Sequence, residues 1–137
     1  MKHKGNKVDF LKQRDAELMR VFKAALHDAD HIDMDEIGRK MVETPCSRFW
    51  VSEERATAVI SAVMRGEPIL QTMRGERKEM FEELADRVSR LRTGQPQTPL
   101  YDIVLKAVHS PAPKFYLTAR YAMQVIYRMK KDCSRNR

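Results

Sequence analysis

The chain has 137 residues and a formal net charge of +7, with 42% hydrophobic and 33% charged residues. This apolar content excludes an intrinsically disordered chain, and 5 glycines with 6 prolines are too few for an all-β protein, which must turn about every ten residues. We therefore expect an all-α protein. No stretch reaches the roughly eighteen consecutive apolar residues of a membrane span, so no membrane segment is expected.

The first predicted element is a long amphipathic helix near the N-terminus. Its apolar positions recur about every 3.6 residues and are Val8, Leu11, Leu18, Phe22 and Ala25. Asp15 interrupts this stripe, which argues against a long coiled coil. An acidic segment follows, in which Asp28 or Asp30 is expected to end the helix and Asp33 to cap the next one.

Two histidines of this segment raise the question of a metal site. His27 and His31 are four residues apart, a spacing that on a helix can present both imidazoles to one ion. An EF-hand does not fit, because the fifth and twelfth positions counted from Asp33 are Ile37 and Thr44. We interpret the segment as a helix–helix loop and predict no metal and no cofactor.

A short helix is predicted over Met34–Val42, ending before Pro45 because the residue ahead of a proline avoids the helical conformation. Arg48, Phe49 and Trp50 follow in an extended segment, where neighbouring side chains point in opposite directions. Phe49 is expected in the core. Trp50 either stacks on a base beside a phosphate-binding Arg48, or is a second buried anchor.

A third helix is predicted to start after Ser52, whose hydroxyl can accept a hydrogen bond from an unpaired N–H of the first turn. It is expected to end at Arg65-Gly66, with the glycine as a left-handed cap. The stretch between the second and third helices is about nine residues long. A helix-turn-helix motif joins its two helices by a turn of three or four residues, so this motif is not predicted.

The chain matches itself at an offset of 66 residues, with Met34–Arg65 over Leu100–Lys131. Eight positions are identical, where roughly two are expected from composition. The identical pairs are Ile37/Ile103, Lys40/Lys106, Val42/Val108, Pro45/Pro111, Phe49/Phe115, Ala56/Ala122, Val59/Val125 and Ile60/Ile126. We interpret this as a tandem duplication into two pseudo-equivalent three-helix units, 1–66 with a basic N-terminal tail and 67–137 with a basic C-terminal tail.

The second copy repeats the pattern of the first. Its long amphipathic helix has the apolar positions Met73, Met80, Phe81, Leu84, Val88 and Leu91. A loop at Gly94–Pro99 precedes a short helix over Leu100–His109, and Thr118 is the expected cap of the last helix. Lys114, Phe115 and Tyr116 take the places of Arg48, Phe49 and Trp50, with the same two interpretations.

Positive charge is concentrated at the C-terminal end. Between 114 and 137 there are seven basic residues and one acidic residue, a balance of 7 − 1 = +6. A weaker cluster at the start of the chain contains Lys2, Lys4, Lys7 and Lys12. A basic surplus at one end indicates an anionic partner, either nucleic acid or a membrane surface.

No catalytic signature is found, because none of the four histidines is tied by a motif to a nucleophile or carboxylate, and no glycine-rich phosphate loop occurs. We therefore expect a protein that is not an enzyme. Two cysteines without a secretory signal are typical of free thiols in a reducing compartment, so a cytoplasmic location is expected.

Two functional hypotheses remain. The first is a nucleic-acid-binding protein, for DNA or RNA, that uses its basic C-terminal helix; the second is a helical adaptor or structural protein that binds a protein partner or forms a homodimer. The residues predicted to contact nucleic acid are Lys114, Tyr116, Arg120, Arg128, Lys130, Lys131, Arg48 and Trp50.

Overall fold

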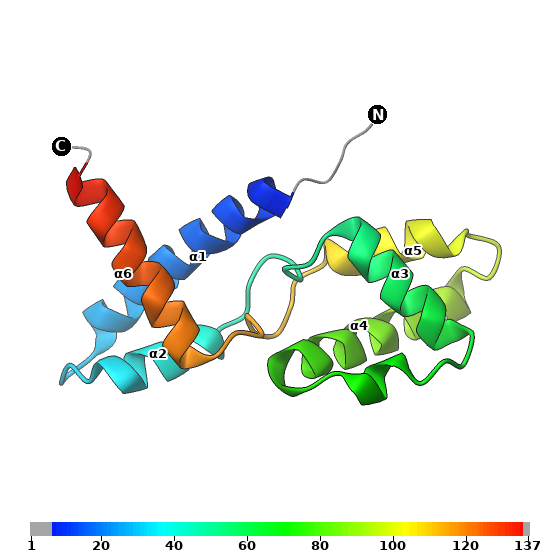
Figure 1. Cartoon of the computed structure of the whole chain (residues 1–137), viewed down its shortest axis with the longest axis horizontal. Helices are drawn as coiled ribbons and strands as arrows, with labels where there is room; N and C mark the ends of the chain where they lie inside the picture. The colour runs from blue at the N-terminus through cyan, green and yellow to red at the C-terminus, as the bar shows by residue number, and fades with distance from the viewer. Residues whose placement is uncertain (1–6, 136–137) are drawn as a thin grey trace.

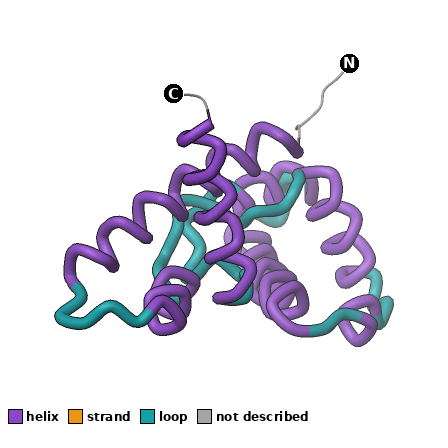
Figure 2. Tube along the Cα trace, turned by 60° about the vertical axis from the view of Figure 1, so that its left-hand side comes forward, coloured by secondary structure: helices purple, strands orange, loops and turns teal. Residues whose placement is uncertain are grey.

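The computed structural model describes the backbone of residues 7–135 and the side chains of 10–134, so Lys2, Lys4 and the side chain of Val8 lie outside the described part. This part contains six α-helices, one 3-10 helix and no strand (Figure 2). The elements are α1 (Lys7–Asp28), α2 (Met34–Val42), α3 (Glu53–Met64), η1 (Ile69–Thr72), α4 (Gly75–Gly94), α5 (Leu100–Val108) and α6 (Ala119–Arg135). The all-α prediction is confirmed.

Local signals place the helix ends where the sequence predicted them. The hydroxyl of Ser52 accepts a hydrogen bond from the Arg55 N–H at 3.0 Å, and that of Thr118 accepts one from the Tyr121 N–H at 3.1 Å. Asp33 caps α2 in the same way. Gly66 follows α3 with a φ of +84°, the predicted left-handed cap.

One expectation about the second copy is wrong. Met73 does not belong to the long helix, because α4 begins only at Gly75, a left-handed residue with a φ of +59°. Met73 instead follows η1 and is still buried, since this short helix packs against α3 and α4.

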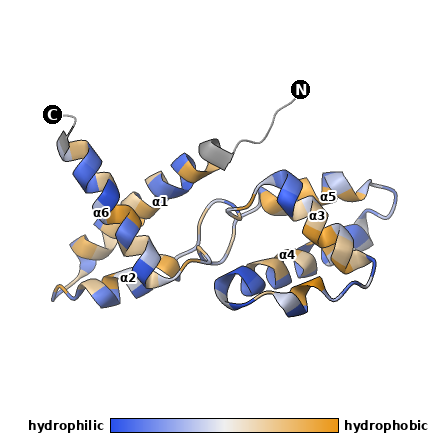
Figure 3. Ribbon diagram, viewed as in Figure 1, coloured by the Kyte–Doolittle hydropathy of each residue, from blue (hydrophilic) through white to orange (hydrophobic). Residues whose placement is uncertain are grey.

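The helices form two lobes (Figure 1). The first lobe consists of α1, α2 and α6, and the second lobe consists of α3, α4 and α5 with η1. Each half of the sequence thus contributes its third helix to the lobe that holds the first two helices of the other half, so each lobe combines helices from both sides of residue 66. Apolar residues line the inner faces of both lobes (Figure 3).

Two extended segments cross between the lobes, and each one joins a short helix in one lobe to a third helix in the other. We call them the first connector (43–52) and the second connector (109–118). Cys46 and Ala112 exchange a pair of backbone hydrogen bonds, both 3.0 Å. The Phe49 N–H donates to the Val108 carbonyl and the Phe115 N–H donates to the Val42 carbonyl, both at 2.9 Å. Every one of these contacts is related to its mate by the offset of 66 residues, so the connectors pair in the register of the sequence repeat.

The aromatic side chains of the connectors stack across the crossing. The ring of Phe49 lies 5.9 Å from that of Tyr116, and the ring of Trp50 lies 6.2 Å from that of Phe115. Phe49 and Phe115 are 0% and 1% exposed, so their predicted place in the core is confirmed. Because the stacks join one connector to the other, they hold the two lobes together.

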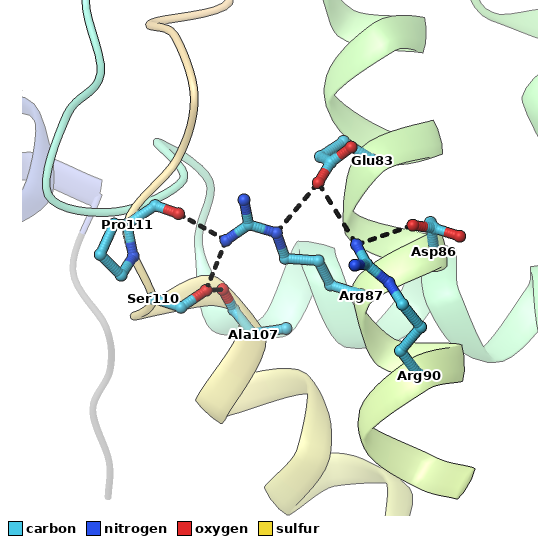
Figure 4. A network of polar contacts seen from close by, with 7 residues as sticks. All are labelled: Glu83, Asp86, Arg87, Arg90, Ala107, Ser110 and Pro111. Atoms are coloured by element: carbon cyan, nitrogen blue, oxygen red, sulfur yellow. Dashed lines mark hydrogen bonds and ion pairs between the residues drawn. The ribbon is translucent and has the colours of Figure 1, made fainter.

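Side chains of the long helices anchor the connectors. On α1, buried Glu17 accepts hydrogen bonds from the N–H and the hydroxyl of Ser47 in the first connector. On α4, Glu83 occupies the repeat position of Glu17 and accepts a hydrogen bond from Arg87 at 3.0 Å. Arg87 in turn donates to the Ser110 hydroxyl and the Pro111 carbonyl of the second connector (Figure 4). Each connector is therefore fixed to the long helix of its own repeat before it crosses to the other lobe.

Candidate nucleic-acid interface

The eight residues predicted to contact nucleic acid fall into three different environments. Arg48 and Trp50, both 9% exposed, are buried at the connector crossing. The Arg48 guanidinium donates to the carbonyls of Phe49 and Val51 at 2.9 and 2.7 Å and lies over the rings of Phe10 and Trp50. These contacts fix the path of the first connector. Neither side chain presents a surface to a ligand, and Trp50 is the buried anchor of the two interpretations.

Lys114 and Tyr116 lie beside a row of carboxylates on α4. The Lys114 ammonium is 3.1 Å from Glu79, and this hydrogen bond raises the pKa of Lys114. Tyr116 is half-buried against Phe49, and burial raises its pKa to about 12. Glu79, Glu82 and Glu83 line the cavity around both residues. Phosphates would be repelled here, so we leave Lys114 and Tyr116 out of the candidate interface.

The four remaining basic residues, on α6, are exposed. Arg128 forms an ion pair with Asp15 at 3.1 Å, and the Lys130 ammonium lies 4.8 Å from the centre of the Phe22 ring, so both hold α6 against α1. Arg120 and Lys131 form no ion pair with any residue of the described part. The opposite side of α6 is apolar as predicted: Ala122, Val125 and Ile126 are buried and Met129 is half-buried.

At 100° per residue, the free face of α6 carries Arg120, Gln124, Tyr127 and Lys131 in one stripe. Tyr127 is 50% exposed, so part of its ring is open to a ligand. This stripe combines cations with an aromatic ring, the two kinds of side chain that bind phosphates and bases.

A cavity of about 540 Å³ lies between α2 and α6 and opens beside this stripe. We call it the α2–α6 groove; it is lined by Met34, Asp35, Arg39, Ala119, Arg120, Met123, Gln124 and Tyr127. The two helices approach each other closely at Gly38 and Ala119, where a Cβ atom added to Gly38 would lie only 3.2 Å from the Ala119 carbonyl oxygen. Arg39 is exposed and, within the described residues, has no ion-pair partner.

Arg39 and Tyr127 were missed by the sequence-based prediction. Arg39 belongs to the first copy, and only the exchange of third helices brings it next to Arg120. The signal for Tyr127 was present, because the stripe from Arg120 to Lys131 places it at helical spacing between two cations. The candidate interface therefore combines residues from both halves of the sequence.

Cys46 lies in surroundings that disfavour a reactive thiol. The Cys46 thiol is buried at the connector crossing, 3.3 Å from the Arg48 carbonyl oxygen, and burial raises its pKa to about 11. It is therefore protonated at neutral pH and a poor nucleophile. In the described part of the chain, no three His, Cys, Asp or Glu side chains are grouped to hold a metal ion, and no helix has the length and apolarity needed to cross a membrane.

No protein-family model, curated protein or solved structure matches this chain.

Proposed function

We propose that the protein binds nucleic acid through the α2–α6 groove and the free face of α6, and that it does so without catalysing a reaction. The observation that carries the proposal is the set of three exposed cations, Arg39, Arg120 and Lys131, none of which has an acidic partner among the described residues. Cations of a merely solvated surface are usually interspersed with carboxylates. Unpaired cations next to an exposed aromatic ring favour a phosphate-bearing partner.

On the second lobe, helix α4 pairs two of its arginines internally: Arg87 with Glu83, and Arg90 with both Glu83 and Asp86 (Figure 4). Arg77 on the same helix is exposed and forms no ion pair in the described part, so an unpaired cation alone does not mark the interface. We place the interface on the first lobe because its unpaired cations adjoin an exposed aromatic ring and the α2–α6 groove. A cytoplasmic location remains the expected one for such a protein, with both cysteines as free thiols.

The adaptor hypothesis is less well supported. Among the described residues, the large exposed hydrophobic side chains are Ile32, Tyr101, Tyr121 and Tyr127. They come from the α1–α2 loop, from α5 and from α6, in both lobes, whereas a protein-binding surface is usually one contiguous apolar patch. This hypothesis takes the place of the first if the binding experiment below fails.

Replacing Arg39, Arg120 and Lys131 together by Gln should strongly weaken binding of DNA and RNA oligonucleotides in fluorescence anisotropy. Each lost phosphate contact lowers the slope of log K against log salt by about 0.7 on single strands, so the slope should fall by about 2. The fold should not change, because these side chains make no ion pair in the described part. Circular dichroism checks this.

The matched control replaces Arg55, Arg77 and Arg92 by Gln. These arginines are exposed on α3 and α4, and their loss changes the net charge by the same amount. The control should keep wild-type affinity apart from a small general loss of charge attraction. Equal losses in both variants, or no binding by the wild type at low salt, would refute the proposed interface.

A further inference from the structure

We infer that the α2–α6 groove accepts an unpaired base of a single-stranded nucleic acid, with the base against the Tyr127 ring and the neighbouring phosphates on Arg39 and Arg120. The inference rests on the proposed function and adds the class of nucleic acid that this site selects.

The shape of the site favours a single strand. The groove is a hollow of about 540 Å³, within the size range of pockets that enclose small ligands. Bases inside a duplex are stacked on both faces and present only their edges in the grooves, whereas an unpaired base can insert and offer a whole face. A hollow next to an exposed aromatic ring therefore suits a base that has left the stack.

The walls of the groove have the chemistry of a base site. Met34, Ala119 and Met123 provide apolar surface, and methionine sulfur packs favourably on aromatic rings. Tyr127 supplies a half-exposed ring on which a base can stack. Gln124 and Asp35 supply an amide and a carboxylate that can form hydrogen bonds with the edge of a base.

The charges around the groove favour a flexible single strand over a rigid duplex. Arg39 and Arg120 stand on two different helices that both line the groove, α2 and α6. A second cavity shares Arg39 and Ala119 with the groove but is also lined by Glu43, Glu76 and Glu79. Those carboxylates would repel the phosphates of a rigid duplex that continues toward the second lobe. A flexible single strand can turn away from them.

The test uses the full-length protein and three fluorescein-labelled probes of equal length: oligothymidylate, oligouridylate and a duplex DNA. At equal salt the wild type should bind the single strands more tightly than the duplex, and the two single strands distinguish DNA from RNA. Tyr127→Ala should weaken single-strand binding about tenfold or more, the loss expected for one stacked base, and leave duplex binding unchanged. Tyr127→Phe should restore the affinity, because it keeps the ring. Tyr101→Ala is the matched control, since Tyr101 is 48% exposed on α5 of the other lobe, and should bind like the wild type.

The outcomes separate this inference from the proposed function. Tighter binding of the duplex, or single-strand binding that is insensitive to Tyr127→Ala, overturns the base site and leaves nucleic-acid binding standing. An equal loss for single strands and duplex also overturns it, because the ring would then not select an unpaired base. No binding of any probe by the wild type overturns both.

Discussion

A disulfide should form in the double variant Gly38→Cys/Ala119→Cys and should not form in Gly38→Cys/Glu53→Cys. A Cβ atom added at Gly38 would lie 3.3 Å from the Cβ of Ala119, just below the range of about 3.5–4.5 Å found in disulfides. Glu53 occupies on α3 the repeat position that Ala119 occupies on α6. It would face α2 if each repeat kept its third helix, but α3 packs in the second lobe, away from α2.

The experiment removes the exposed thiol with Cys133→Ser, retains buried Cys46, and introduces a protease site in the exposed turn after Gly66. After oxidation and cleavage, the Gly38→Cys/Ala119→Cys protein should run on a non-reducing gel as one species that contains both halves, and reduction should separate them. Thiol titration of the control should find its two introduced cysteines free. Separated halves in the first variant, or oxidised cysteines in the control, would contradict the exchange of third helices.

Phe49→Ala should lower the free energy of unfolding by about 3–5 kcal/mol, the usual cost of removing a buried phenylalanine side chain. Phe49 is 0% exposed, stacks on Tyr116 and lies beneath the Arg87 guanidinium. A small domain has only about 5–15 kcal/mol of stability, so this is a large fraction of the total. Phe115→Ala should have a comparable effect, since Phe115 occupies the equivalent place against Trp50.

Urea unfolding followed by circular dichroism measures this loss, with Tyr101→Ala as the exposed control that should cost about 0.5 kcal/mol or less. Both phenylalanine variants should still unfold in one transition, because each lobe contains helices from both repeats. A loss below about 1 kcal/mol for Phe49→Ala would mean that the stacks do not hold the lobes together. Two separate transitions in the wild type would mean that the crossing does not couple them.

Local chemistry explains how much of the fold could be predicted. Pro45 and Pro111 limit the short helices, and the hydroxyls of Ser52 and Thr118 start the last ones. Each of these signals acts within a few residues of its own position. The expected alternation in the first extended segment does not hold, because Arg48 and Trp50, on either side of buried Phe49, are buried as well. The tandem duplication stays a prediction from the sequence match, whose offset of 66 residues is also the register in which the connectors pair.

The exchange of helices could not be predicted, because an amphipathic stripe shows that α3 or α6 has an apolar face but not which helix covers it. The candidate site was only partly predicted for the same reason. Lys114 does not belong to the candidate site because its ammonium is paired with Glu79, which is 35 residues away in the sequence. Arg48 is buried because its guanidinium binds backbone carbonyls whose positions depend on the crossing.

The central claim is that nucleic acid binds to the free face of α6 and to the adjoining α2–α6 groove. An amide-resolved NMR titration of the full-length protein with a single-stranded oligonucleotide tests it most directly, because it locates the contact surface without any substitution. We predict that the largest shift changes occur at Arg39 on α2 and along the stripe Arg120, Gln124, Tyr127 and Lys131, while α4 and α5 stay unchanged. Changes centred on α4 and on Lys114 and Tyr116 of the second connector, or none at saturating oligonucleotide, would contradict the claim.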